Sequence, residues 1–481
     1  MHLIVILRVT GILLTLFSLV LLIPVLIALL YGEDTVGTFA TAFGITLASG
    51  AALFLAARDR RELRSGDGFL ITVLFYSGLG LFGAIPLYLS DAVPGGFTDA
   101  AFESLSGLTT TGATVISGLD ELPRSILFYR QLLQWLGGMG IIVLAVAILP
   151  MLGIGGMQLY RAEFPGPLKD NKLTPRITET AKALWYLYVG ITVACALSYW
   201  AAGMPLFDAV CHSFSTVAIG GFSTHDASIG YFANPAVEAV AVVFMVLAGI
   251  NFSLHFFALT RLNPLLYWRD WEVRLYLLVL SGVATIVCLI LLGNPASTAT
   301  PWRDGIFQAV SIATTTGFTT SDFNLWPSAA PVVLMFAAFA GGCAGSTAGG
   351  IKIVRVLLIY LQGMREIRRL IHPDGVFTIK LGRHRVPDRV VDSVWGFFAV
   401  YVITFLSMVS LVMLITELDF YSAFSAVAAC LNNLGPALGE VAQDYAELPT
   451  AAKWLLISAM LLGRLEIFTL LVLLTPAFWR R

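Results

Sequence analysis

Long apolar stretches restrict the fold of this sequence more than any other feature. A helix that crosses the hydrocarbon core of a bilayer needs about 20 predominantly apolar residues, and 58% of the 481 residues are hydrophobic while only 12% are charged. Ten stretches meet this requirement, so we predict an all-α polytopic membrane protein. The predicted spans are 4–30, 36–57, 68–89, 126–152, 183–202, 236–259, 273–292, 330–361, 391–416 and 452–478. The first is too long for a signal peptide and lacks a small-residue cleavage site, so we expect an uncleaved anchor.

The basic residues predict the orientation of these spans. With ten spans, 24 of the 29 Lys and Arg residues fall on one side of the membrane, and by the positive-inside rule that side is the cytoplasm. Both termini are then expected to be cytoplasmic. The opposite side is rich in carboxylates, which either concentrate cations at a pore mouth or are merely solvated loop charges. These residues are Glu33, Asp34, Asp91, Asp120, Glu121, Asp226, Asp322, Asp419, Asp444 and Glu447.

Four segments align when one glycine is fixed in each, which indicates an internal repeat. They read DAAFESLSGLTTTGAT (99–114), DAVCHSFSTVAIGGFS (208–223), DGIFQAVSIATTTGFT (304–319) and SAFSAVAACLNNLGPA (422–437). The aligned glycines are Gly112, Gly221, Gly317 and Gly435. Each segment lies between two predicted spans, so we predict the order helix, pore loop, helix four times over.

An Asp or Ser precedes each aligned glycine by thirteen residues, at Asp99, Asp208, Asp304 and Ser422. These residue types are preferred helix N-caps, so we predict that each caps a helix of about 11 residues, which covers only about half of a bilayer core. Non-helical backbone at membrane depth is tolerated where it is buried in protein or lines water. The glycine-bearing segments after the short helices are therefore expected to line a polar cavity.

The residue types in these segments suit a monovalent cation. Glycine adopts positive φ at low cost, so successive carbonyls can turn toward a central axis, and carbonyl and threonine oxygens can replace the hydration shell of a potassium ion. The partially negative C-terminal ends of four short helices would favour a cation at the same place. The alternative is that these Thr/Gly turns merely connect spans, which the equal spacing in four copies disfavours.

The motifs TTTGAT, AIGGFST, TTTGFTT and NNLGPALG together resemble the filter loops of the Trk/Ktr potassium-uptake family, within the superfamily of K transporters. The two spans before the first repeat are similar to the TrkH-like membrane subunit. The resemblance implies a K⁺-selective pore within one subunit, although NNLGPA departs from the pattern because it contains Pro436 and lacks threonine. The implied K⁺-binding filter residues are Thr110, Thr111, Gly112, Ile219, Gly220, Gly221, Thr315, Thr316, Gly317, Asn433, Leu434 and Gly435.

The resemblance also implies a domain order and partners. Residues 1–64 would form two N-terminal transmembrane helices, followed by pore repeats at 65–160, 180–262, 270–363 and 388–481, the third with a broken second helix. We expect a homodimer in the bacterial inner membrane, controlled by a cytosolic nucleotide-binding ring of TrkA type. Potassium would be the transported and bound ion, without a prosthetic group and without nucleic acid as a partner.

Two further features are similar to the family's gate. The glycine-rich stretch GGCAGSTAGG (341–350) interrupts the eighth span, and Arg464 lies within the last one. The implied gate residues are Gly341, Gly342, Gly345, Ser346, Thr347, Gly349, Gly350 and Arg464. The alternatives are a kink that permits close helix packing and a structural ion pair between Arg464 and Glu466.

These observations bear on three candidate functions. We predict a gated potassium pore. The alternative is a secondary K⁺ symporter coupled to H⁺ or Na⁺. Such transporters usually contain inverted repeats, whereas these four repeats start on the same side of the membrane. A membrane enzyme is disfavoured, because the six histidines are scattered and form no catalytic cluster.

The five cysteines have no metal-site spacing and are expected to be buried thiols. The basic segment 365–389 is either a partner-docking site, a lipid-binding site or only a topology signal.

Overall fold

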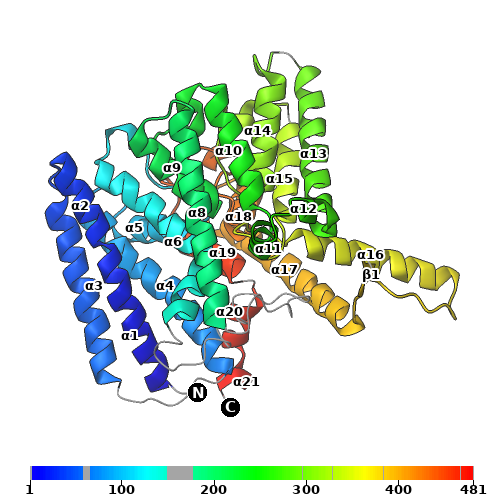
Figure 1. The fold of residues 1–481 in the computed structure, drawn as a ribbon, viewed down its shortest axis with the longest axis horizontal. Helices are drawn as coiled ribbons and strands as arrows, with labels where there is room; N and C mark the ends of the chain where they lie inside the picture. Colours follow the sequence, from blue (N-terminus) through cyan, green and yellow to red (C-terminus); the bar gives the residue numbers. More distant parts are fainter. Residues whose placement is uncertain are drawn as a thin grey trace.

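The computed structural model describes residues 3–57, 65–148, 177–294, 296–327, 329–382, 384–465 and 467–479. Within these ranges nearly all regular structure is helical (Figure 1). The only strands there are β1 (Lys380–Leu381) and β2 (His384–Arg385), an antiparallel pair in which Lys380 faces Arg385. All five cysteines are free and buried. The predictions of an all-α chain and of buried thiols are confirmed.

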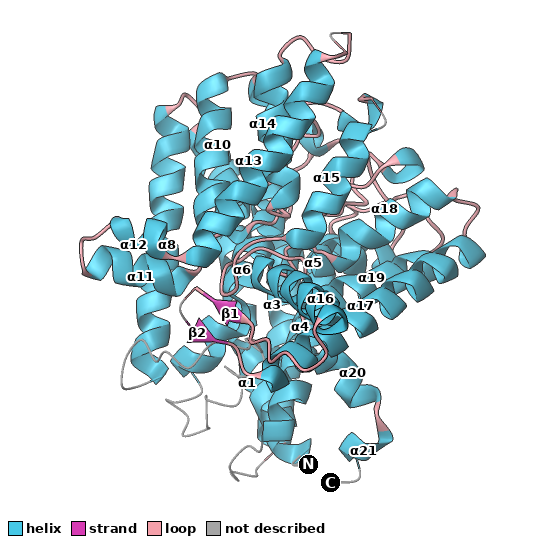
Figure 2. Ribbon diagram, turned by 90° about the vertical axis from the view of Figure 1, so that its right-hand side faces the viewer, coloured by secondary structure: helices cyan, strands magenta, loops and turns pink. Residues whose placement is uncertain are grey.

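Six helical segments in the described residues are long and apolar enough to cross a membrane. The first combines α1 (Leu3–Val20) and α2 (Leu22–Tyr31), and the others are α3 (Val36–Ala56), α4 (Ser65–Leu89), α8 (Ile177–Ala201), α13 (Trp271–Leu292) and α17 (Asp388–Ile415). Helices α1 to α3 form one edge of the molecule, and α1 begins at the same end of the bundle at which the chain ends (Figure 1, Figure 2). Most of the basic residues used for the orientation, including Arg58 to Arg64 and Arg480, lie outside the described residues or in loops.

The remaining apolar stretches are not continuous helices, which corrects the prediction for 126–152, 236–259 and 452–478. Helix α6 (Arg124–Ile148) contains a non-helical Gly140, with φ 50° and ψ −147°. Helices α10 (Pro235–Ala248) and α11 (Phe252–Thr260) meet at a bend of 96°. Residues 341–352 separate α15 (Ala329–Ala340) from α16 (Ile353–Ile371), as the glycine-rich stretch predicts, and residues 465–467 separate α19 (Thr450–Arg464) from α20 (Phe468–Leu474).

Glycines allow close packing just before two of these breaks. A Cβ atom added to Gly137 of α6 would lie 2.0 Å from the carbonyl oxygen of Leu108, and one added to Gly463 of α19 would lie 2.1 Å from that of Leu431. Leu108 and Leu431 both stand four residues before an aligned glycine. The second helices of repeats 1 and 4 thus approach the ends of the short helices at equivalent points, a distance that only glycine permits.

Each short helix packs against the long helices that flank it in sequence. Helix α5 (Phe97–Leu108) contacts α4 and α6, α9 (Leu206–Ala218) contacts α8 and α10, α14 (Pro301–Ala313) contacts α13 and α15, and α18 (Phe420–Leu431) contacts α17 and α19. The short elements that complete the described chain are η1 (Leu119–Glu121), η3 (Ser228–Phe232), α12 (Leu265–Arg269), η4 (Phe323–Leu325), η5 (Gly439–Val441) and α21 (Pro476–Trp479). The repeat boundaries stay predictions, and the end of the first repeat, 149–160, lies outside the described residues.

Candidate functional site

The four short helices begin earlier than the sequence predicts. They contain 12, 13, 13 and 12 residues, not about 11, and Asp99, Asp208, Asp304 and Ser422 lie in the first turn of the helix. The N-caps are Gly96, Pro205, Thr300 and Asp419, of which Asp419 accepts a side-chain hydrogen bond from the Ser422 backbone N–H at 2.8 Å. The predicted caps are therefore wrong, although a carboxylate in the first turn still interacts favourably with the helix dipole.

The C-terminal ends of the short helices share one geometry. We name the segments that follow them loop 1 (109–118), loop 2 (219–227), loop 3 (314–322) and loop 4 (432–438). In each, the residue two before the aligned glycine has positive φ, and the next N–H bonds back to a carbonyl in the short helix, as in a Schellman motif. The positive-φ residues are Thr110, Ile219, Thr315 and Asn433, and the returning bonds are Thr111 to Ser106, Gly220 to Ser215, Thr316 to Ser311 and Leu434 to Ala429, all 2.8 Å.

The aligned glycines also have positive φ, between 78° and 92°. The backbone thus adopts positive φ at two alternate residues in every loop, which turns successive carbonyls out of a common helical direction. A side chain at these glycines would meet the next loop around. An added Cβ would lie 2.1 Å from the Gly220 oxygen at Gly112, 2.0 Å from the Thr316 oxygen at Gly221, 2.2 Å from the Leu434 oxygen at Gly317, and 2.6 Å from the Thr111 oxygen at Gly435.

These four approaches close a ring. Loop 1 touches loop 2, loop 2 touches loop 3, loop 3 touches loop 4, and loop 4 returns to loop 1. The ring brings together all twelve residues that the sequence singled out for cation binding. Threonine hydroxyl groups also lie buried in loops 1 and 3. The Thr109 and Thr111 hydroxyl oxygens are 2.8 Å apart, and so are those of Thr314 and Thr316. The arrangement presents backbone and hydroxyl oxygens to one place, which is the chemistry that binds a dehydrated monovalent cation.

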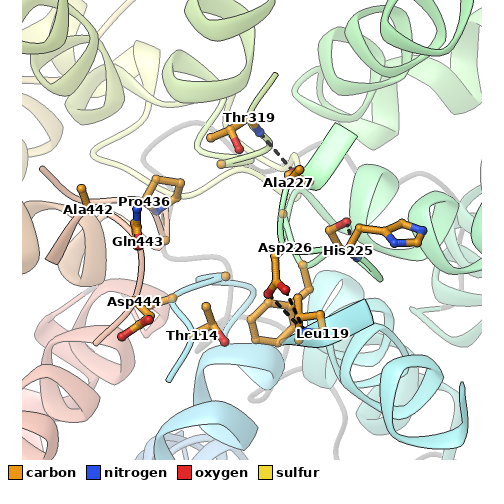
Figure 3. Close-up of a pocket in the computed structure, with 18 of the residues that line it drawn as sticks. Thr114, Leu119, His225, Asp226, Ala227, Thr319, Pro436, Ala442, Gln443 and Asp444 are labelled. Carbon is orange, nitrogen blue, oxygen red and sulfur yellow. Dashed lines mark hydrogen bonds between the residues drawn. The ribbon is translucent and has the colours of Figure 1, made fainter. Parts of the chain in front are cut away.

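A cavity of about 590 Å³ adjoins the ring, and all four aligned glycines line it. Asp226, Asp322 and Asp444 line the same cavity, and Figure 3 shows Asp226 and Asp444 on different loops around it. The Asp226 carboxylate accepts the Leu119 backbone N–H at 3.1 Å, which ties loop 2 to η1. Three of the carboxylates that the sequence assigns to the outer face therefore lie at the mouth of this ring, where negative charge attracts cations.

The glycine-rich segment 341–352 packs against the other end of the ring. The Gly349 N–H donates to Thr315 Oγ1 at 2.7 Å, and the Gly350 N–H donates to the Asn432 carbonyl at 3.1 Å. The Thr347 hydroxyl donates to the Val217 carbonyl at 2.9 Å, at the end of α9. This segment thus contacts the ends of three short helices, so it lies in line with the ring.

Arg464 joins this segment to α6. Its guanidinium donates to the Gly138 carbonyl at 3.2 Å and to the Thr347 carbonyl at 3.3 Å, and it also bonds the Gly137 carbonyl. The suggested alternative partner, Glu466, lies outside the described residues. The two parts of the predicted gate are therefore in direct contact with each other.

Comparisons with known proteins agree with this arrangement. Residues 37–481 match the TrkH family model, described as cation transport protein. The chain belongs to the TrkH family. A relative from Halomonas elongata, named Trk system potassium uptake protein TrkH, is 57% identical over 99% of both chains, and the Escherichia coli K12 protein of the same name is 53% identical over all of both. The crystal structure of the potassium transporter TrkH from Vibrio parahaemolyticus superposes with a TM-score of 0.90 at 52% identity and covers all of both chains.

Two polar residues of this TrkH-family chain form hydrogen bonds with the ring although the sequence did not predict them as site residues. Gln134 of α6 donates to the Gly220 carbonyl at 2.6 Å and accepts the Phe222 N–H at 3.0 Å. The Tyr445 hydroxyl donates to the Gly435 carbonyl at 2.9 Å. A signal for Gln134 was present, because polar residues inside an apolar span are costly and usually functional, and Arg130, Gln131 and Gln134 interrupt the span 126–152.

His225 links loop 2 to η1 and to the start of α9 at the rim of the cavity. Its ring stacks on Tyr231, forms an ion pair with Asp120 and lies 3.7 Å from Asp208. Burial alone would lower the pKa of His225, but the Asp208 and Asp120 carboxylates outweigh burial and raise that pKa above its ordinary value.

We expect the thermal stability of the purified protein to fall as the pH rises above about 6.5, the ordinary His pKa. A raised folded-state pKa contributes stability that is complete below the unfolded pKa and is lost as the pH rises through the folded one. His225→Gln should remove this component, so its Tm should change by roughly 1–3 °C less between pH 6 and 8 than that of the parent. Identical pH profiles of Tm for the two proteins would contradict this assignment.

Proposed function

We propose that this protein conducts potassium ions across the membrane through a pore whose narrowest part is the ring formed by loops 1 to 4. The single observation that carries the proposal is the closure of that ring by four equivalent glycine-to-carbonyl approaches. In this view the ion exchanges water for oxygens of the twelve ring residues. The names of the relatives from Halomonas elongata and Escherichia coli support potassium as the substrate.

A continuous pore is favoured over a symporter by the relation between the repeats. The four loops have the same backbone conformation and face one cavity, as expected for parallel repeats around one axis. Coupled transporters instead usually place their substrate between inverted repeats at broken helices. Coupling of K⁺ to H⁺ or Na⁺ remains the alternative, because broken second helices also occur here.

We assign the gate to the segment 341–350 together with Arg464. The segment contacts the ends of α9, α14 and α18 on the side opposite the cavity. A cation that leaves the ring would therefore meet the loop and the Arg464 charge. Movement of the loop away from the Thr315 hydroxyl and Asn432 carbonyl would open the path.

The partners are proposed from the family resemblance. We expect a homodimer in the bacterial inner membrane, with both termini in the cytoplasm and a TrkA-type nucleotide-binding ring docked on the cytosolic face. The chain belongs to a family of transport proteins, and we assign it no enzymatic reaction.

The test is ion flux into proteoliposomes that contain the purified protein. We expect uptake of K⁺ and Rb⁺ at similar rates, and Na⁺ uptake at least about tenfold slower, because an oxygen ring that replaces the K⁺ hydration shell fits Na⁺ less well. Empty liposomes are the control. Equal K⁺ and Na⁺ rates would contradict potassium selectivity, and Rb⁺ uptake that requires a proton or Na⁺ gradient would favour the symporter.

A further inference from the structure

A buried ion pair lies behind loops 1 and 2. Glu103 of α5 and Arg130 of α6 are 0% and 1% exposed, and Arg130 Nε and Nη2 lie 2.8 Å and 2.7 Å from Glu103 Oε1. The guanidinium carbon also stacks over the Phe222 ring, 4.2 Å from its centre. A buried ion pair contributes little net stability compared with apolar residues of the same size. Its contacts therefore give more information about its role than its burial does.

Within the part of the chain that the structure describes, the other side-chain hydrogen bonds of this pair reach residues just beyond the aligned glycines. Glu103 accepts the Val115 N–H and the Thr114 hydroxyl, both at 3.0 Å. Arg130 donates to Thr114 Oγ1 at 3.2 Å and to the Ser223 carbonyl at 3.1 Å. Thr114 and Ser223 each stand two residues after an aligned glycine. The pair thus fixes loop 1 relative to loop 2.

The equivalent position in the other repeats is occupied by different residues. Glu103 stands four residues after Asp99, and the corresponding residues are His212, Gln308 and Ala426. His212 Nε2 bonds the Ser223 hydroxyl at 3.0 Å, and Gln308 Nε2 donates to the Ser321 carbonyl at 3.0 Å, so each holds its own loop. Ala426 has no polar group. Among these four positions, only Glu103 takes part in an ion pair that reaches a second loop.

We propose that Glu103 and Arg130 are positioning residues for ion discrimination, which they control by holding loops 1 and 2 at a fixed separation. The inference rests on the proposed function of the ring. Discrimination between K⁺ and Na⁺ depends on the number and the spacing of the oxygens around the ion. If the tie between the two loops is lost, the Thr111 and Gly220 carbonyls can move closer to a smaller ion, and Na⁺ gains access.

The test compares Glu103→Gln with the parent protein in proteoliposomes and measures the ratio of Rb⁺ to Na⁺ flux. We expect this ratio to fall about tenfold in Glu103→Gln, and to recover in part in Glu103→Asp, which keeps the charge. The matched control is Glu238→Gln, which breaks a second Arg–Glu pair, the one between Glu238 and Arg303. Arg303 lies at the start of α14, whereas the glycine of loop 3 follows the end of that helix. Its ratio should equal that of the parent.

The outcomes separate the two proposals. An unchanged ratio in Glu103→Gln, or an equal fall in Glu238→Gln, would overturn the positioning role while the parent stays selective. A parent without any preference for Rb⁺ would instead overturn the proposed function. If Glu103→Gln does not fold, Thr114→Val removes the shared hydroxyl and leaves the ion pair intact. We expect its ratio to fall about threefold, and a parental ratio would overturn the inference.

Discussion

Gly317→Ser is expected to lose most of the preference for K⁺ over Na⁺. The residue has a φ of +87°, and an added Cβ would lie 2.2 Å from the Leu434 carbonyl oxygen and 2.6 Å from Pro436 Cδ. Neither contact is tolerable, so loop 3 or loop 4 must shift, and a non-glycine residue at this φ is itself strained by about 1–2 kcal/mol. We expect the ratio of Rb⁺ to Na⁺ flux to fall at least about tenfold, which corresponds to roughly 1.4 kcal/mol of discrimination.

A glycine of the same repeat provides the control for this experiment. Gly282 lies in α13, and a Cβ added there would meet no atom of the described residues within 4 Å apart from the neighbouring backbone of its own helix. Gly282→Ser is therefore expected to keep the parental flux and the parental ratio. A folded Gly317→Ser protein with the parental ratio would show that the glycine-to-carbonyl approaches do not shape the ion path.

Arg464→Gln is expected to conduct faster than the parent protein. Arg464 places a positive charge beside the segment 341–352, in contact with the Thr347 carbonyl. At an effective dielectric constant of about 20, a unit charge roughly 8 Å from a passing cation raises its energy by about 2 kcal/mol. Removal of the charge should increase Rb⁺ flux by tenfold or more, measured in proteoliposomes with equal amounts of protein.

Arg464→Lys distinguishes the charge from the hydrogen bonds. Lysine keeps the positive charge but cannot reproduce the planar fork that reaches the Gly138 and Thr347 carbonyls together. Slow, parent-like flux in Arg464→Lys would assign the barrier to charge. Fast flux in both variants would assign it to the attachment of the loop, and flux in Arg464→Gln at or below the parental rate would exclude Arg464 as a barrier.

The four short helices and their glycine-bearing loops could be predicted from the sequence because their determinants are local. Each unit is a short helix followed by a turn and a glycine at fixed spacing. About sixteen consecutive residues specify such a unit, as the segment 304–319 illustrates. The same information repeated four times between apolar spans gave the predicted order of helix, loop and helix. The start of each short helix was less well specified, because Asp304 suits both an N-cap and a first turn, and Pro301 begins the helix earlier.

Contacts between distant segments explain what the sequence did not reveal. The approach of Gly137 to Leu108 packs α6 against the end of α5, and the bond from Gln134 to the Gly220 carbonyl joins residues 86 positions apart. Neither pairing leaves a periodic or spacing signal. Glu103 and Arg130 likewise read as isolated polar residues until the fold places them together. Only their presence in apolar segments marked them as unusual.

The most direct test of the central claim is to locate the ion. Crystals grown in Rb⁺ give anomalous scattering that identifies its binding positions without reference to flux. We expect at least one peak on the axis of the ring, surrounded by carbonyl oxygens of loops 1 to 4 between the cavity and Gly349. Rb⁺ found only among the carboxylates of the cavity, with none inside the ring at saturating Rb⁺, would contradict the account.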